Sequence, residues 1–107
     1  MPDSMLNRTL AALAEPTRLG AMRILWGQGG DGGEHCVCEL MERLGASQSR
    51  MSRHMATLKA AGLIVDRRDR QWVRYRLNPD LPADIRAVVA AVMAAAIEEQ
   101  ENERNAA

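Results

Sequence analysis

Two cysteines one residue apart, Cys36 and Cys38, are the side chains in this sequence best suited to chemistry. Thiolates are soft donors that bind soft metals and metalloids. Side chains two positions apart on an α-helix point about 200° away from each other, so one cysteine must lie in unwound backbone if both are to hold one atom. At a helix start, the backbone dipoles also favour thiolates. The neighbouring imidazole of His35 adds a third donor, which still leaves tetrahedral Zn(II) without a fourth protein ligand.

A basic segment is the second feature with chemical potential. Residues 43–76 carry nine Lys and Arg against two acids, whereas residues 1–42 carry three against six and residues 77–107 carry two against six. The net charge of zero therefore conceals a basic middle third. Such a block is either a solvated face or a surface that binds a polyanion such as nucleic acid.

The size and composition indicate one globular domain, 1–107, with a core of aliphatic side chains and methionine. The 107 residues include no Phe, one Tyr and two Trp, and this composition favours helices. No apolar run is long enough to span a membrane, and residues 1–4 lack the features of a signal peptide. We therefore expect a cytoplasmic protein, in which two cysteines are thiols rather than a disulfide.

Helical periodicity and breakers divide the chain into five helices. The first two are predicted at about 4–14 and 16–26, on either side of the break at Glu15 and Pro16. Residues 27–33 contain five glycines and form a loop. A short third helix follows the thiol segment and ends at Gly45. Ser47 caps a fourth helix that reaches about Ala61, and the last helix begins at about 83.

The fourth helix has two different faces. Met51, Met55 and Leu58 lie within about 60° of one another and form its buried stripe. The opposite face is small, polar and cationic, and consists of Ser49, Arg53, Ala56 and Ala60, flanked by Arg50, Ser52 and Thr57. A face of this kind suits insertion into a DNA major groove about 12 Å wide. A merely solvated amphipathic helix remains the alternative for this element on its own.

A basic β-hairpin follows the fourth helix. One strand starts at 63–65, residues 67–70 form a charged turn, and residues 72–77 alternate between apolar and polar side chains. A short helix, a turn, a second helix with a cationic face and a basic hairpin make a winged helix-turn-helix. We therefore predict a mainly α fold with about five helices and one two-stranded wing. Phosphate or minor-groove contacts are expected from Arg67, Arg68 and Arg70.

The last helix carries a long apolar face. Its apolar positions are Ile85, Val88, Val89, Val92, Met93, Ala96 and Ile97. This face either only covers the core or also pairs with a second copy. We favour a twofold dimer formed by residues 4–14 and 83–100, because two recognition helices then meet half-sites about 34 Å apart. Residues 98–107 form an acidic tail.

Several motifs together resemble the arsenical-resistance repressors of the ArsR/SmtB family, over about residues 5–98. They are Cys36-Val37-Cys38-Glu39-Leu40, the run from Ser47 to His54, the run from Leu58 to Ile64, Arg67-Arg68, and Tyr75-Arg76-Leu77. The resemblance implies a homodimeric repressor that binds double-stranded operator DNA without a cofactor. It also implies release when trivalent arsenic or antimony binds Cys36 and Cys38, with arsenite, antimonite or methylarsenite as the inducer. DNA contacts would come from Gln48, Ser49, Arg50, Ser52, Arg53 and His54. A packing role for His54 is as plausible as a DNA contact.

One departure from this family leaves the effector open. The best-studied family motif has a third cysteine where this chain has Met41, and a thioether is a weak donor that is more often a core side chain. Zinc, another soft metal, thiol oxidation or no effector remain alternatives, as do RNA and protein partners for the winged helix. An enzyme is not expected, because no catalytic motif is present and Cys-Val-Cys lacks the two-residue gap of thiol oxidoreductases.

Overall fold

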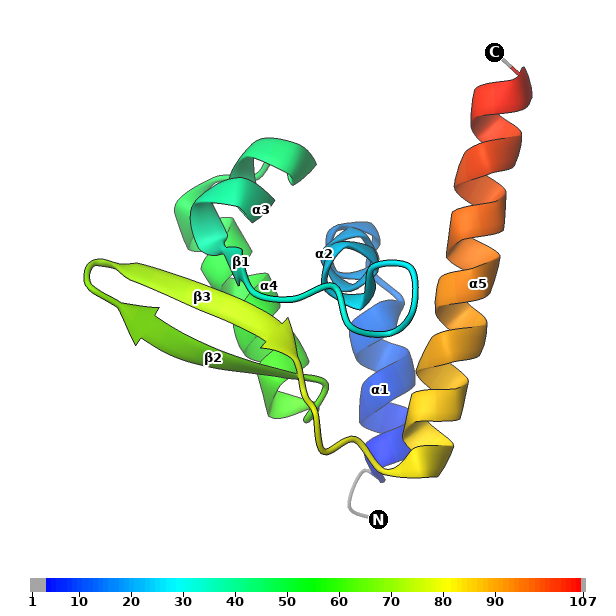
Figure 1. The fold of residues 1–107 in the computed structure, drawn as a ribbon, viewed down its shortest axis with the longest axis horizontal. Coiled ribbons are helices and arrows are strands. Elements are labelled where there is room, and N and C mark those ends of the chain that lie inside the picture. The colour runs from blue at the N-terminus through cyan, green and yellow to red at the C-terminus, as the bar shows by residue number, and fades with distance from the viewer. Residues whose placement is uncertain (1–3, 107) are drawn as a thin grey trace.

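The computed structural model describes residues 4–106 and contains five helices and three strands in this range (Figure 1). The signal-peptide assessment of residues 1–3 and the last residue of the acidic tail, 107, lie outside the described residues. The elements are α1 (Met5–Leu13), α2 (Pro16–Trp26), β1 (His35–Cys36), α3 (Val37–Leu44), α4 (Gln48–Ala60), β2 (Ile64–Asp69), β3 (Trp72–Leu77) and α5 (Ala83–Ala106). The predicted winged helix-turn-helix and its five helices are confirmed.

Local capping residues explain where the helices begin and end. The Ser4 hydroxyl accepts a hydrogen bond from the Asn7 amide at the start of α1. The Ser47 hydroxyl does the same for the Arg50 amide at the start of α4. Helix α3 ends at Gly45, whose left-handed backbone (φ 65°) costs a glycine little. These caps separate α3 from α4 by a tight turn, which is the turn of the helix-turn-helix.

The sheet differs from the prediction in two respects. It has three antiparallel strands in the order β1-β3-β2, because the two residues of β1 pair with β3. In addition, β2 continues to Asp69, so Arg67 and Arg68 lie in a strand and the turn consists of Arg70 and Gln71. The hydrogen-bonding register between β2 and β3 extends the hairpin to its tip. The expected charged turn at residues 67–70 was therefore too wide.

The core lies between α2, α3, α4 and the sheet, and the predicted stripe of α4 forms its centre. Met51, Met55 and Leu58 have no exposed surface, and neither do Leu40 of α3 and Leu25 of α2. The expected core of aliphatic side chains and methionine is confirmed. Because α3 packs on α4 through this interior, a displacement of α3 must be accommodated by α4.

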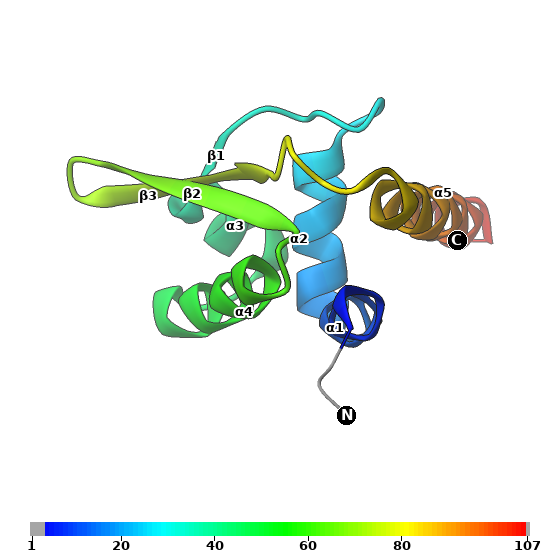
Figure 2. The same cartoon turned by 90° about the horizontal axis from the view of Figure 1, so that it is seen from below.

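Helix α5 and the wing lie at opposite ends of the molecule (Figures 1 and 2). The side of α5 that faces α1 and α2 buries Ile85, Val89, Met93 and Ala96. The last turns, from Glu98 onwards, are exposed and lie at the end of α5 far from the wing. Of the described helices, none is both long and apolar enough to cross a membrane.

Candidate nucleic-acid interface and thiol site

The outer face of α4 presents the predicted recognition side chains to solvent. Every predicted contact residue of α4 is exposed except His54, which is partly buried; the exposed ones are Gln48, Ser49, Arg50, Ser52, Arg53 and Thr57. The Thr57 hydroxyl donates to the Arg53 carbonyl oxygen at 3.2 Å, which holds its methyl group and oxygen against the helix. The face therefore exposes short polar side chains together with two arginines, a composition that suits contact with a major groove.

Arg18 of α2 joins this face, although the sequence analysis did not single it out. Its Nε donates to the Ala12 carbonyl oxygen at 2.7 Å, and its Nη1 lies 3.2 Å from Nδ1 of His54. A cavity of about 280 Å³ opens beside these groups, lined by Arg18, Arg50, Arg53, His54 and Thr57. No acidic side chain lines it, so its electrostatics suit a phosphate group. The 36-residue separation between Arg18 and His54 left no local signal in the sequence.

His54 has a packing contact as well as a place at the rim of this cavity. Its Nδ1 lies 3.6 Å from the Glu15 carboxylate, in addition to the Arg18 contact. Burial raises the pKa of Glu15, but backbone hydrogen bonds from Arg18 and Thr17 and the charges of His54 and Arg18 outweigh it, so the pKa lies below its ordinary value. An ionised Glu15 thus neutralises part of the positive charge behind α4.

The wing arginines divide into paired and unpaired groups. Arg67 donates two hydrogen bonds to the Glu34 carboxylate, at 2.6 and 2.7 Å, and the hydrogen bond from Arg67 lowers the pKa of Glu34. Arg74 donates to Asp69 at 2.8 Å. Arg68 and Arg70 are exposed and have no ion-pair partner among the described residues. These two are therefore better placed for DNA phosphates than Arg67, which must share its donors.

The thiol segment has the backbone break that the spacing required. Cys36 is the extended N-cap residue of α3 (φ −66°, ψ 144°), and Cys38 lies in the first turn of the helix. The Cys36 Sγ accepts a hydrogen bond from the Cys38 amide at 3.2 Å. The expectation that one cysteine lies outside the helix is confirmed.

The two sulfur atoms are bonded to each other as a disulfide in this structure. The expectation of two free thiols therefore differs from the structure. The reason is the N-cap geometry, which turns the Cys36 side chain back over the first turn of α3 and onto Cys38. The same convergence is what a single atom bridging the two sulfurs would require.

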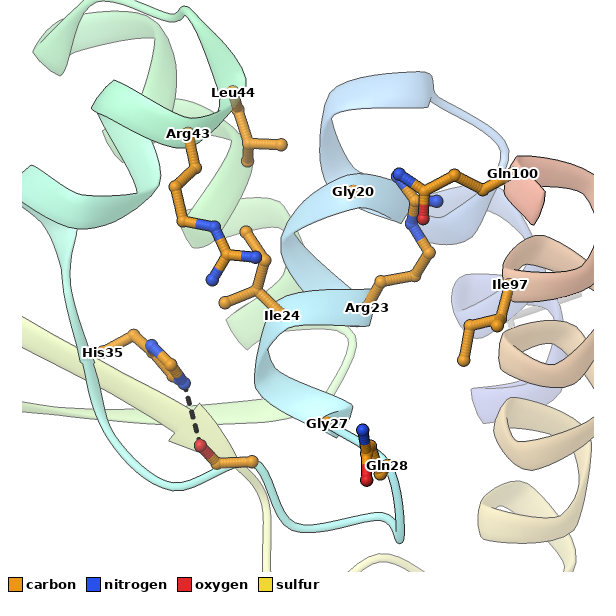
Figure 3. Close-up of a pocket in the computed structure, with 11 residues that line it drawn as sticks. Gly20, Arg23, Ile24, Gly27, Gln28, His35, Arg43, Leu44, Ile97 and Gln100 are labelled. Atoms are coloured by element: carbon orange, nitrogen blue, oxygen red, sulfur yellow. Dashed lines mark hydrogen bonds between the residues drawn. The ribbon is translucent and has the colours of Figure 1, made fainter. Parts of the chain in front are cut away.

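His35 is turned away from the thiols and is fully occupied. Its Nδ1 lies 2.8 Å from the Glu39 carboxylate and its Nε2 2.8 Å from the Gly32 carbonyl oxygen, the contact drawn in Figure 3. Side chains of consecutive strand residues point to opposite faces, which separates His35 from Cys36. Among the described residues, no three or more His, Cys, Asp or Glu side chains gather as metal ligands would. These contacts weigh against a zinc site that uses His35.

The cavity beside His35 is separate from the thiol pair. It measures about 560 Å³ and lies between α2, the end of α3 and the last turns of α5, with Arg23 and Arg43 on either side of α2 (Figure 3). Cys36 and Cys38 are not among its lining residues. This cavity is therefore not a site that the two sulfurs form.

Comparisons with known proteins agree with this geometry. Residues 15–65 match the family model described as bacterial regulatory protein, arsR family. The arsenic resistance transcriptional regulator ArsR2 of Pseudomonas putida is 59% identical over 51 residues, which cover 48% of this chain and 44% of that protein. The arsenical resistance operon repressor of Escherichia coli is 46% identical over 71 residues, covering 66% of this chain and 57% of that protein. The matches thus span about half the length of these relatives.

Solved structures extend the comparison over most of the chain. HlyU from Vibrio cholerae superposes with a TM-score of 0.68 at 31% identity, covering 82% of this chain and 87% of that one. The homodimeric winged helix-turn-helix DNA-binding domain Mb0332 from Mycobacterium bovis has a TM-score of 0.68 at 26% identity, covering 92% and 83%. The structural similarity therefore extends beyond the residues that match the family model.

Proposed function

The chain belongs to the arsR family of bacterial regulatory proteins, and from this premise we propose that it is a metalloid-responsive transcriptional repressor. Its dimer binds operator DNA in the absence of effector and is released when trivalent arsenic or antimony binds Cys36 and Cys38. The family consists of regulators, so the chain is not an enzyme. As a regulator that binds DNA, the protein is expected to act in the cytoplasm.

The observation that carries the proposal is the position of the thiol pair directly against the DNA-reading unit. Cys36 caps α3, and α3 packs through Leu40 on the buried side of α4. The opposite side of α4 carries the exposed cationic face. One short helix therefore separates a site for soft ligands from a surface suited to DNA.

DNA binding uses α4 for sequence and the wing for position. Major-groove contacts come from Gln48, Ser49, Arg50, Ser52, Arg53 and Thr57, with His54 and Arg18 at the phosphate cavity beside them. Arg68 and Arg70 reach the backbone or the minor groove. Arg67 contributes mainly through its charge, because its donors face Glu34.

Dimerisation uses α1 and α5, that is residues 4–14 and 83–100. Leu6 and Leu10 of α1 are 44% and 48% exposed, which is costly for leucines on a monomer surface. Val88 and Val92 of α5 are only partly buried. The homodimeric domain from M. bovis shares this fold, which supports a twofold assembly through the same two helices. The acidic tail begins at residue 98, overlaps the end of this interface and continues past it.

The inducer binds the reduced pair. Arsenite, As(OH)₃, reacts with two thiols to form two As–S bonds, and two hydroxide groups leave with the two thiol protons as water. A cellular dithiol reduces the disulfide beforehand. Met41 is partly buried and packs on the core, so we assign it a packing role and leave the third arsenic position to a hydroxide, or to the methyl group of methylarsenite.

Release follows from the geometry of the N-cap. In the reduced protein the two sulfurs are not bonded to each other. An arsenic atom bonded to both pulls Cys36 over Cys38 and distorts the first turn of α3. Because α3 and α4 share a close-packed interior, α4 must shift with it. A coupling free energy of about 1 to 3 kcal/mol is enough to empty much of an operator.

Fluorescence anisotropy of operator DNA tests this function. Arsenite, antimonite, methylarsenite, Zn(II) and peroxide are each added to the reduced wild-type protein and to the Cys36→Ser and Cys38→Ser variants. We expect arsenicals to release DNA from wild type and from neither variant. Release from both variants refutes the thiol site, whereas tight DNA binding without any arsenical response leaves a repressor with another effector.

The disulfide supports a second candidate effector, namely thiol oxidation. In that case peroxide releases the DNA and arsenite does not. Peroxide oxidises the two thiols to the disulfide and is itself reduced to water. The same anisotropy series separates the two candidates, because each predicts a different active compound.

A further inference from the structure

Strand β1 makes Cys36 part of two elements at once. Cys36 caps α3, and it also pairs with Arg74 of β3 in the sheet that forms the wing (Figure 1). Arg74 in turn pairs with Arg67 of β2. Cys36, Arg74 and Arg67 therefore form one row across the three strands. The thiol pair is attached to the wing as directly as it is to the recognition helix.

An ion pair spans the same three strands. Glu34, two residues before Cys36, accepts two hydrogen bonds from the Arg67 guanidinium, at 2.6 and 2.7 Å. Since β3 lies between β1 and β2, this contact crosses the middle strand and joins both edges of the sheet. A two-bond pair between a guanidinium and a carboxylate fixes relative orientation as well as distance.

We propose that Glu34 is a positioning residue that fixes the wing to the thiol segment, so that events at Cys36 and Cys38 reorient the wing. This inference rests on the proposed function for its consequence at DNA. A displacement of Cys36 moves Glu34 through the single intervening residue, His35, and moves β3 through the strand pairing. A change at the thiol pair thus alters the orientation of the wing as well as that of α4.

The exposure of the Glu34–Arg67 ion pair indicates that it positions the wing rather than stabilises the fold. The side chains of Arg67 and Glu34 are 54% and 32% exposed, and such pairs add little to folding stability. Their geometric effect does not depend on that energy, because the pair joins the two edges of the sheet across β3. The alternative role for Glu34 is that of a counterion that weakens DNA binding by neutralising Arg67.

The test compares Glu34→Gln with Asp69→Asn in the full chain. Asp69 also pairs with a wing arginine, Arg74 at 2.8 Å, but this contact stays within the hairpin. Both variants remove one negative charge and keep the side-chain shape. Trp72 at the wing tip is 39% exposed and Trp26 in the core is 8% exposed, so ¹⁹F NMR of 5-fluorotryptophan protein reports the wing separately.

We expect reduction of the disulfide, and then arsenite, to shift the Trp72 signal in wild type and in Asp69→Asn. The shift should be clearly smaller in Glu34→Gln, in which only the strand pairing of Cys36 with Arg74 still joins the thiol segment to the wing. Operator affinity of the reduced protein should fall roughly fivefold in Glu34→Gln, at the lower end of allosteric couplings, whereas the Trp72 response of Asp69→Asn should match that of wild type. A Trp72 response in Glu34→Gln equal to wild type overturns the proposal. Tighter DNA binding by Glu34→Gln, with a salt dependence that corresponds to about one additional phosphate contact, also overturns the proposal. That outcome identifies Glu34 as a counterion of Arg67.

Failure of the proposed function is recognised independently. If arsenite does not protect the thiols from alkylation, the proposal of arsenic sensing is wrong. The coupling is then tested by comparing the Trp72 signal of the disulfide form with that of the dithiol form. If the protein binds no DNA, the Trp72 signal still decides the coupling. The proposal for Glu34 thus has its own readout.

Discussion

Arg18 combines two roles that one substitution can separate. Its Nε donates to the Ala12 carbonyl oxygen at 2.7 Å, which ties α2 to the end of α1, and its Nη1 contacts His54 of α4. It also lines the cationic cavity beside the recognition helix. The Arg18→Met substitution keeps most of the aliphatic length and removes every guanidinium contact. We therefore expect losses both in stability and in DNA affinity.

The size of each loss follows from the contacts. A hydrogen bond from a charged donor contributes about 1.5 to 3 kcal/mol, and partial exposure of Arg18 reduces this to about 1 to 2 kcal/mol of unfolding free energy. Loss of one phosphate contact reduces the slope of log affinity against log salt by about 0.9. Arg53 is the matched control, because its exposed guanidinium has no partner among the described residues.

Urea unfolding and anisotropy at several salt concentrations measure the two effects. Arg53→Met should weaken DNA binding while its unfolding free energy stays within about 0.5 kcal/mol of wild type. Arg18→Met should change both quantities. If Arg18→Met leaves stability unchanged, the contact with α1 is unimportant. If it lowers stability but not the salt slope, the cavity does not hold a phosphate and the reasoning about it is wrong.

Three further predictions concern other parts of the chain. Ser47→Ala should lower the unfolding free energy in urea by about 1 kcal/mol, since it removes the N-cap of α4; an unchanged midpoint contradicts this. Leu10→Glu should convert the proposed dimer into a folded monomer in sedimentation experiments, because it places a charge in the proposed α1 interface, and a dimer of unchanged affinity refutes that interface. Arg74 lowers the pKa of Asp69 below its ordinary value of 3.8, so the pair stabilises the wing tip above that value and the contribution disappears as the pH falls through the lowered pKa. Trp72 fluorescence should therefore change in this acid range in wild type and not in Asp69→Asn.

The helices and their faces were predictable from local pattern. Ser47 and Gly45 have side-chain and backbone properties that set helix ends without reference to the rest of the fold. The stripe of Met51 and Met55 follows from helical spacing, and the structure buries both. The need for a backbone break between the two cysteines followed from the angle between neighbouring helical positions. In each case the cause lies within a few residues of its effect.

The contacts that complete the candidate site were not predictable in this way. Arg18 meets His54 across 36 residues, and Glu34 meets Arg67 across 33. Strand β1 is too short to produce a periodic signal, and it exists because β3 offers it a free edge. The charges counted in the sequence therefore predicted that Arg67 contacts DNA, whereas in the structure its guanidinium donates to the Glu34 carboxylate.

Cys36 and Cys38 illustrate the division most clearly. The sequence by itself determined that two soft donors precede a basic helix-turn-helix, because residue identity and spacing need no fold. Only the tertiary structure decided that Cys36 belongs to the helix cap and to the wing sheet together, and that its sulfur meets that of Cys38. The physical reason is that strand pairing and side-chain convergence depend on where distant segments pack, which no local pattern encodes.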